Sequence, residues 1–201
     1  MKRNDLKGDI IRAGFKAFAK ADYQHVSTNQ IVEDARVSKG LLFHYFKSKP
    51  QLYLALYETA WNIIHRDTFE GFPFADRDVF QRLKALVMRK SEAMHKHKTL
   101  TAFIKRVHMH TANHDIVKAR VNIYQQFQQR NYKRVFDDID TTAFRNREYL
   151  DEIYKIVTWT FTKIHNDWER VHASKENADA LKILENELVH YTTFFKAYFY
   201  Q

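Results

Sequence analysis

Apolar residues recur every three or four positions along most of the chain, and this spacing predicts α-helices. In residues 5–21, Leu6, Ile10, Ala13 and Ala17 form part of a broad apolar stripe. Similar patterns predict helices over 51–69, 76–96, 100–110 and 115–136, with Asp76 as an N-cap. Strand signals are absent. The pattern therefore predicts an all-α protein whose longest loop covers residues 137–148.

Residues 27–49 are expected to hold two short helices and the start of a third, each preceded by a capping residue. Ser27 and Gln30 have capping-box spacing, in which the serine oxygen accepts a backbone N–H and the glutamine side chain reaches back; Ser48 and Gln51 repeat it. Ser38 is a suitable N-cap for the second helix. The segment 35–37 between the helices is short enough for only a tight turn. This arrangement predicts a helix-turn-helix.

The run from Ser38 to Lys49, Ser-Lys-Gly-Leu-Leu-Phe-His-Tyr-Phe-Lys-Ser-Lys, resembles the N-terminal DNA-binding domain of TetR-family transcriptional regulators. Two positions depart from the family: Arg36 stands where a glycine is common, in a turn that often needs positive φ, and Phe43 stands where tyrosine is common. The resemblance implies a helix-turn-helix DNA-binding domain over residues 1–48. It implies a helical regulatory and dimerisation domain over residues 49–201.

The candidate DNA-binding residues divide by chemistry. Hydroxyls and ammonium groups near helix N-termini suit phosphate contacts, and the candidates are Thr28, Ser38, Lys47 and Lys49. Side chains of the second helix suit base edges, and the candidates are Lys39, Leu41, His44 and Tyr45. Gly40 either lets the backbone approach DNA or reflects close packing between helices.

Composition narrows the class of protein. The 201 residues include no cysteine, which excludes disulfides and cysteine chemistry and fits a reducing cytoplasm. No apolar stretch follows the N-terminal residues, and no run approaches the length of a membrane span. We therefore expect a soluble, cytoplasmic protein.

The formal net charge is +9. Residues 1–50 contain ten lysines and arginines and five acidic residues. Positive charge is therefore expected to be densest at the helix-turn-helix, as phosphate binding requires.

The last two predicted helices carry apolar stripes with alternating spacings of three and four. A single stripe could be satisfied inside one chain. Because a helix-turn-helix reads half-sites in pairs, two adjacent stripes favour a two-fold four-helix interface and a homodimer. The expected interface residues are Leu181, Leu184, Leu188, Tyr191, Phe195, Ile153, Val157 and Ile164.

The middle of the chain is rich in aromatic residues, and the family commonly has a hydrophobic ligand pocket there. The candidate ligand contacts are Trp61, Phe103, Arg106, Tyr124, Phe127 and Trp159, although core packing explains each single aromatic better than a ligand contact does. Arg106 and His108 could meet an acidic effector or face water.

Catalytic and metal chemistry find little support. The pairs His95/His97 and His108/His110 have i,i+2 spacing, which points them apart on a helix, and Asn113 is expected to break the helix between His110 and His114. There is no phosphate loop, nucleophile elbow or dinucleotide fingerprint. We expect neither an enzyme nor a bound metal or cofactor.

These observations predict a dimeric transcriptional regulator that binds a palindromic operator in double-stranded DNA. The most specific form of this hypothesis is a repressor released by a small hydrophobic effector. The alternative is an architectural or partner-controlled DNA-binding protein of the same fold that has no small-molecule effector.

Overall fold

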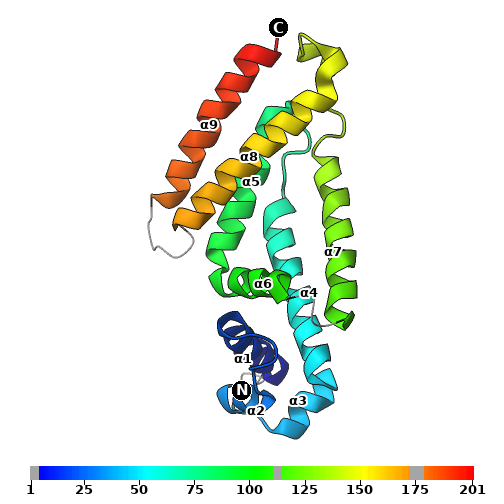
Figure 1. The fold of residues 1–201 in the computed structure, drawn as a ribbon, viewed down its shortest axis with the longest axis vertical. Coiled ribbons are helices and arrows are strands. Elements are labelled where there is room, and N and C mark those ends of the chain that lie inside the picture. Colours follow the sequence, from blue (N-terminus) through cyan, green and yellow to red (C-terminus); the bar gives the residue numbers. More distant parts are fainter. Residues whose placement is uncertain (1–4, 111–114, 173–178) are drawn as a thin grey trace. The chain divides into compact units, whose positions relative to one another are not determined.

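A computed structural model describes residues 5–110, 115–172 and 179–201. The regular structure of these residues is helical, apart from one isolated bridge between Phe144 and Tyr200, which confirms the all-α prediction (Figure 1). The helices are α1 (Leu6–Lys20), α2 (Thr28–Asp34), α3 (Lys39–Phe46), α4 (Lys49–Phe69), α5 (Val79–Lys96), α6 (Lys98–His110), α7 (Asp115–Arg134), α8 (Leu150–His172) and α9 (Ala180–Phe199). None of the described helices is long and apolar enough to cross a membrane.

Two of the expected boundaries need correction. The helix predicted from Asp76 begins at Val79, because Asp78 is the capping residue: its Oδ1 accepts hydrogen bonds from the backbone N–H groups of Phe80 and Gln81. The expected loop over 137–148 contains two short 3-10 helices, Thr141–Ala143 and Arg147–Tyr149. The expected helix break at Asn113 lies outside the described residues.

The chain forms two compact units. The first joins residues 1–64 with residues 97–127, and the second joins residues 65–96 with residues 128–201. The predicted boundary at residue 48 separates a DNA-binding from a regulatory domain. It divides the chain by function rather than by compactness, and it stays a prediction. Because α6 and the start of α7 belong to the first unit, the helix-turn-helix shares its unit with part of the expected regulatory domain.

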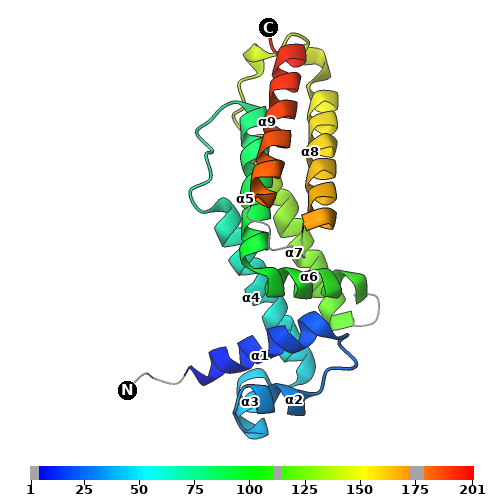
Figure 2. The ribbon, with the colours of Figure 1, turned by 90° about the vertical axis from the view of Figure 1, so that its left-hand side faces the viewer.

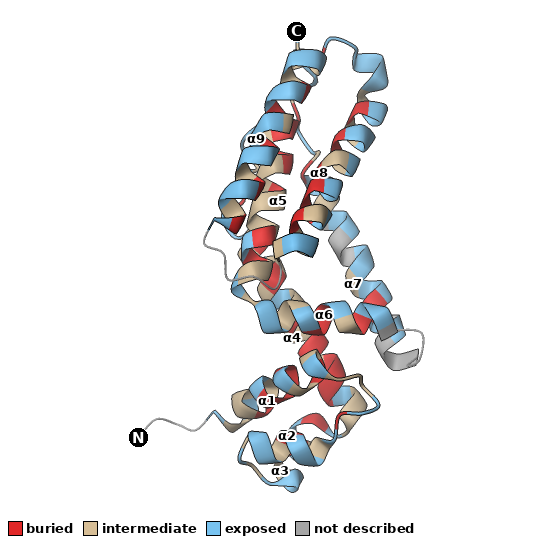
Figure 3. Cartoon of the chain, turned by 60° about the vertical axis from the view of Figure 1, so that its left-hand side comes forward, coloured by how far each residue is buried: buried red, intermediate tan, exposed pale blue. Residues whose placement is uncertain are grey.

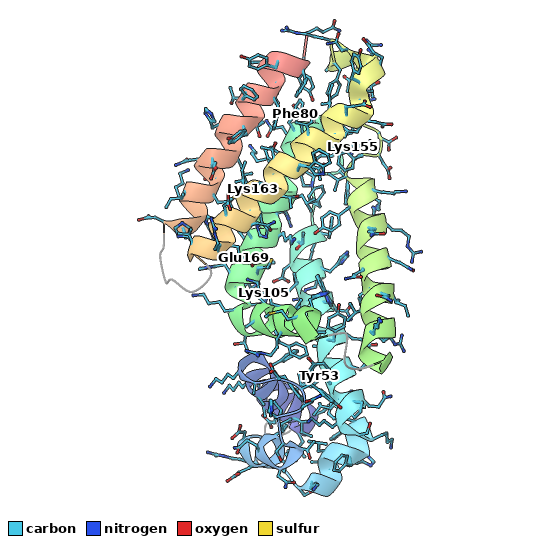
Figure 4. All side chains as sticks on the ribbon, in the orientation of Figure 1. Tyr53, Phe80, Lys105, Lys155, Lys163 and Glu169 are labelled. Atoms are coloured by element: carbon cyan, nitrogen blue, oxygen red, sulfur yellow. The ribbon has the colours of Figure 1, made fainter. Side chains whose placement is uncertain are left out.

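The core of the first unit is aromatic. Within this unit α6 packs against α1 (Figure 2), and Phe103 of α6 is fully buried there. The ring of Phe103 lies 5.5 Å from that of Phe15 and 5.2 Å from that of Tyr53, measured between centroids. Tyr53, labelled in Figure 4, belongs to α4, so this ring contact ties α6 to α4. Phe103 is therefore a core residue, which weighs against its nomination as a ligand contact.

In the second unit, α5, α8 and α9 pack together around a buried core that includes Phe80 (Figures 1 and 4). Most of the stripe expected to face a partner lies inside this core: Ile153, Val157, Ile164, Leu184, Leu188 and Phe195 are buried, and Leu181 and Tyr191 pack against them half-buried. Figure 3 shows the buried positions on the inner sides of α8 and α9. The two stripes thus satisfy each other and α5 within one chain, which corrects their assignment to a dimer interface.

Two arginines of α5 bind the ends of neighbouring helices. The buried guanidinium of Arg82 donates to the carbonyl oxygens of Phe74 and Asp76, which precede α5. It also donates to those of Val135 and Asp137, which lie just beyond the end of α7. Arg89, two turns further along α5, donates to the carbonyl oxygens of Thr68, Glu70 and Gly71 at the end of α4. Since carbonyl groups at helix ends lack intrahelical partners, the guanidinium groups of these two arginines cap the helix C-termini.

We expect Arg82→Met to lower the free energy of unfolding by about 3 kcal/mol, because it leaves several buried carbonyl groups without a donor. Arg82→Lys should recover only part of this loss, because an ammonium group cannot reach all four oxygens. Urea denaturation followed by circular dichroism measures both. The exposed Arg66, converted to Met, serves as the control and should change stability by less than about 0.5 kcal/mol. Equal effects of the Arg66 and Arg82 changes would contradict the capping role.

Candidate nucleic-acid interface

The predicted helix-turn-helix is present and is held by a small apolar core. Helices α2 and α3 are joined by a short turn, and Ile31 of α2 and Leu42 of α3 are fully buried. Phe46 at the end of α3 is also buried, whereas Phe43 is half-buried. These contacts fix the orientation of α3 relative to α2 and α1.

The positions of the capping residues were predicted correctly, but not all of their hydrogen-bond partners were. Ser38 Oγ accepts from the backbone N–H of Leu41 at 3.2 Å, as an N-cap does. Ser27 Oγ accepts from the N–H of Asn29 at 3.1 Å. Gln30 does not complete the expected capping box, because its side-chain amide donates instead to Asp34 Oδ1 at 3.0 Å. A partner one turn ahead on the same helix outcompetes the backbone at the helix start.

The turn between α2 and α3 has the conformation that the sequence suggested. Arg36 has φ of 55°, which a glycine would adopt without steric cost. Lys47, which ends α3, also has a positive φ of 63°. The positive φ at Lys47 was not predicted, because a lysine gives no sequence signal for this conformation.

Most of the residues nominated for base contacts lie on the exposed side of α3. Lys39, His44 and Tyr45 are exposed, Leu41 is half-buried, and the rings of His44 and Tyr45 meet edge to face with centroids 5.5 Å apart. At Gly40, an added Cβ would come no nearer to another atom than 3.9 Å, from Ser38 Oγ. Helix packing therefore does not require glycine here, and the alternative of close approach to DNA is left open.

The four residues nominated for phosphate contacts differ in their availability. Ser38 and Lys47 are exposed, and Thr28 is half-buried at the start of α2. The Lys49 ammonium lies 4.5 Å from the centre of the Tyr23 ring and 3.5 Å from the carbonyl oxygen of Gln24. Burial lowers the pKa of Lys49. Lys49 is thus held by contacts inside the protein, and a phosphate would have to compete with them.

An ion pair that the sequence analysis missed joins α6 to the segment after α1. Arg106 Nη1 lies 2.6 Å from Asp22 Oδ1, and both side chains are about one-third exposed. The pair could not be found from the sequence because the two residues are far apart along it. Arg106 therefore already has an acidic partner, which weighs against its nomination as a contact for an acidic effector.

Two of the other ligand candidates, Trp61 and Tyr124, form a polar aromatic cluster with Tyr57 and His108 on α4, α6 and α7 of the first unit. The ring of Tyr57 lies 6.2 Å from that of Trp61, 6.0 Å from that of His108 and 5.5 Å from that of Tyr124. We call Tyr57, Trp61, His108 and Tyr124 the aromatic cluster. Trp159 lies elsewhere, exposed on α8 in the second unit, and the side chain of Phe127 lies outside the described residues.

Burial shifts the ionisation of the aromatic cluster. It raises the pKa of Tyr57 to about 12, and the neighbouring Trp61 N–H offsets this rise in part, although its geometry falls short of a hydrogen bond. Burial of the imidazole also lowers the pKa of His108. At neutral pH the cluster therefore holds a phenol and an uncharged imidazole.

Positive charge is not densest at the helix-turn-helix, contrary to expectation. Residues 93–136, which include α6 and α7, contain nine lysines and arginines and one acidic residue. Residues 137–201 contain eight basic and twelve acidic residues. The expectation compared the net charge of residues 1–50 with that of all the remaining residues together. That average hides the difference between residues 93–136 and residues 137–201.

Among the described residues, no group of three or more histidine, aspartate or glutamate side chains is placed to hold a metal ion. The pair His110/His114 lies outside the described side chains.

A capped helix-turn-helix at the start of an all-helical protein defines the class of DNA-binding transcriptional regulators. Residues 10–56 match the family of bacterial regulatory proteins called the tetR family. The N-terminal part of the chain, from α1 to the start of α4, therefore matches the DNA-binding domain of this family.

Known proteins resemble further parts of the chain. The transcriptional regulator AcuR of Cereibacter sphaeroides is 31% identical over 88 residues, an alignment that covers 44% of this chain and 40% of AcuR. A TetR-like regulator from Rhodococcus sp. RHA1 superposes with a TM-score of 0.65 at 15% identity, covering 96% of this chain and 98% of that one. FadR from Bacillus subtilis, solved with stearoyl-CoA, superposes with a TM-score of 0.60 at 16% identity, covering 92% and 97%. At these identities the two structures show that the fold is shared.

The positive φ at Arg36 leads to a prediction about stability. We expect Arg36→Gly to be about 1 kcal/mol more stable than Arg36→Ala, because both variants lose the charge and only glycine relieves the left-handed backbone. Thermal unfolding of the two variants measures the difference. If the alanine variant is as stable as the glycine variant, the turn carries no such strain.

Proposed function

We propose that the protein is a transcriptional repressor that binds a palindromic DNA operator as a homodimer and is released by a small effector. The observation that carries the proposal is the exposed row on α3. There Lys39, His44 and Tyr45 project from a helix whose other side is fixed by buried Leu42 and Phe46. A rigid helix with polar and aromatic side chains on its free face is suited to the major groove. We place the protein in the cytoplasm, where bacterial DNA lies, and assign it no catalytic role.

The aromatic cluster supports effector control. Its members come from three helices of one unit, and Tyr57 OH and Trp61 Nε1 are buried without a hydrogen-bond partner among the described residues. Buried polar atoms are normally satisfied, so a ligand that satisfies them is favoured. The stearoyl-CoA in the FadR structure provides an example of a ligand carried by this fold. Trp61 and Tyr124 remain proposed effector contacts.

Dimerisation is supported by a different set of residues from the one expected. On α8 and α9, large apolar side chains remain exposed in the single protomer: Ile156, Trp159, Val171, Ile183, Val189, Phe194 and Tyr198. Trp159 is 69% exposed and Tyr198 is 64% exposed, and both are large enough to anchor an interface. We propose that these outer faces, rather than the buried stripes, meet a second copy of the protein.

The alternative, an architectural or partner-controlled DNA-binding protein, predicts DNA binding that no small molecule changes. Operator selection from random duplexes, followed by gel-shift titration of candidate effectors, separates the two hypotheses. A palindromic site released by an effector supports the repressor. Binding that is indifferent to sequence and to every small molecule favours the architectural protein.

For DNA reading, we expect His44→Ala and Tyr45→Ala each to cost about 1–3 kcal/mol on the operator and little on random DNA, because they remove base contacts. Lys47→Ala should weaken both kinds of DNA alike and reduce the salt slope by about 0.9, because it removes a phosphate contact. Fluorescence anisotropy at several salt concentrations measures both effects. Lys155→Ala, on α8 (Figure 4), is the control. Equal losses on operator and random DNA for all three variants of α3 and its C-cap would contradict this division.

For the dimer, we expect Trp159→Asp and Phe194→Asp to shift the protein from dimer to monomer at micromolar concentration, because a buried carboxylate in an apolar interface is costly. Sedimentation velocity measures the shift, and circular dichroism checks that the helices remain. Gln129→Asp, at an exposed position of α7, is the control. A dimer that survives both changes on α8 and α9 would place the interface elsewhere.

A further inference from the structure

The aromatic cluster has chemistry that selects the charge of its ligand. Tyr57 is fully buried, and neither its hydroxyl nor the buried indole N–H of Trp61 has a hydrogen-bond partner among the described residues. An indole N–H can only donate, and a phenol readily donates. The Trp61 N–H acts on the Tyr57 hydroxyl without reaching hydrogen-bond geometry, so both groups remain available to a ligand atom that accepts hydrogen bonds.

A weakly paired cation lies close to Tyr124, whose ring contacts that of Tyr57. Arg120 Nε of α7 is 3.9 Å from Glu58 Oε1 of α4, a distance at the limit of an ion pair, and the two side chains are 50% and 37% exposed. Solvent-exposed pairs of this kind contribute little to stability. Both charges act on the Tyr124 hydroxyl, whose pKa is raised by burial and by Glu58 and lowered by Arg120. Arg120 can therefore exchange Glu58 for another anion at low cost.

The net charge of the neighbouring segment also favours an anionic ligand. Residues 97–127, which supply His108, Arg120 and Tyr124 and lie in the same unit as the cluster, carry five basic residues and one acidic residue. Such a distribution raises the local concentration of anions by long-range attraction. The helix-turn-helix is a separate segment, so this charge is not explained by the residues that we assign to DNA.

We propose that the effector is an organic anion, with an apolar or aromatic body that packs on the Tyr57, Trp61 and Tyr124 rings and an anionic group such as a carboxylate, sulfonate or phosphate. Trp61 Nε1 and Tyr57 OH donate to the anionic group, and Arg120 supplies the opposite charge. Glu58 competes for Arg120 and sets the affinity. This inference rests on the proposed effector site and adds the chemical class of its ligand.

A pair of fluorescent dyes tests the proposal. Anilinonaphthalene sulfonate and phenyl-naphthylamine have the same aromatic body, and only the first carries a negative charge. We expect Arg120→Gln to weaken the sulfonate about tenfold and to change the neutral dye by less than about twofold. Glu58→Gln should do the reverse and tighten the sulfonate, because Arg120 loses its competitor. Trp61→Phe should weaken the sulfonate more than the neutral dye, because it removes a donor and keeps a ring.

Lys163→Gln is the matched control, because it removes one exposed positive charge from α8 in the second unit (Figure 4). It should leave both dyes unchanged. The proposal is overturned if the two dyes respond alike to Arg120→Gln and Glu58→Gln, or if Lys163→Gln reproduces the effect of Arg120→Gln. It is also overturned if neither dye binds protein that still binds DNA.

A gel shift with the selected operator separates this inference from the proposed function. If the charge preference is found but anions of this kind never release the operator, the anion site stands and effector-controlled release fails. If aromatic acids and their matched alcohols release the operator equally well, effector control stands and the anion preference fails.

Discussion

Backbone groups at helix ends impose the main constraint on this all-helical fold, because every helix leaves several N–H and C=O groups without intrahelical partners. The protein satisfies many of them with side chains. Asp5, Ser38 and Asp78 accept from N–H groups at the starts of α1, α3 and α5. Arg82 and Arg89 donate to carbonyl groups at or beyond the ends of α7 and α4. Asp78 also binds Lys196 and Tyr200, so one cap joins the start of α5 to the end of α9.

Local signals made the helix-turn-helix predictable, whereas long-range partners remained hidden. Ser38 caps its own helix, so this cap could be read from adjacent residues, whereas the left-handed turn at Arg36 was expected only from the family resemblance. The partners of Arg82 lie up to 55 residues away, and Asp22 and Arg106 are 84 residues apart. Periodicity identified the stripes of α8 and α9 correctly as apolar. It could not tell whether α5 or a second protomer would cover them.

The distribution of charge suits the two proposed surfaces, the exposed face of α3 and the aromatic cluster, to different tasks. On α3 the exposed polar residues are few and specific in kind, which suits base readout more than raw attraction to phosphate. The larger excess of positive charge lies in residues 93–136, which include His108 and Tyr124 of the aromatic cluster. A basic DNA-binding protein therefore need not carry its charge only for DNA, and total charge is a poor guide to where its DNA-binding surface lies.

The composition of the first unit bears on how a ligand could influence DNA binding. Residues 97–127 form this unit together with residues 1–64, so α6 shares it with α1, α2 and α3. His108 of the aromatic cluster and Arg106, which pairs with Asp22, are two residues apart on α6. A ligand that shifts α6 at His108 would therefore strain the ion pair to the segment between α1 and α2. Since tightly packed interiors transmit displacements, the short path through α6 requires no rearrangement of the core formed by α5, α8 and α9.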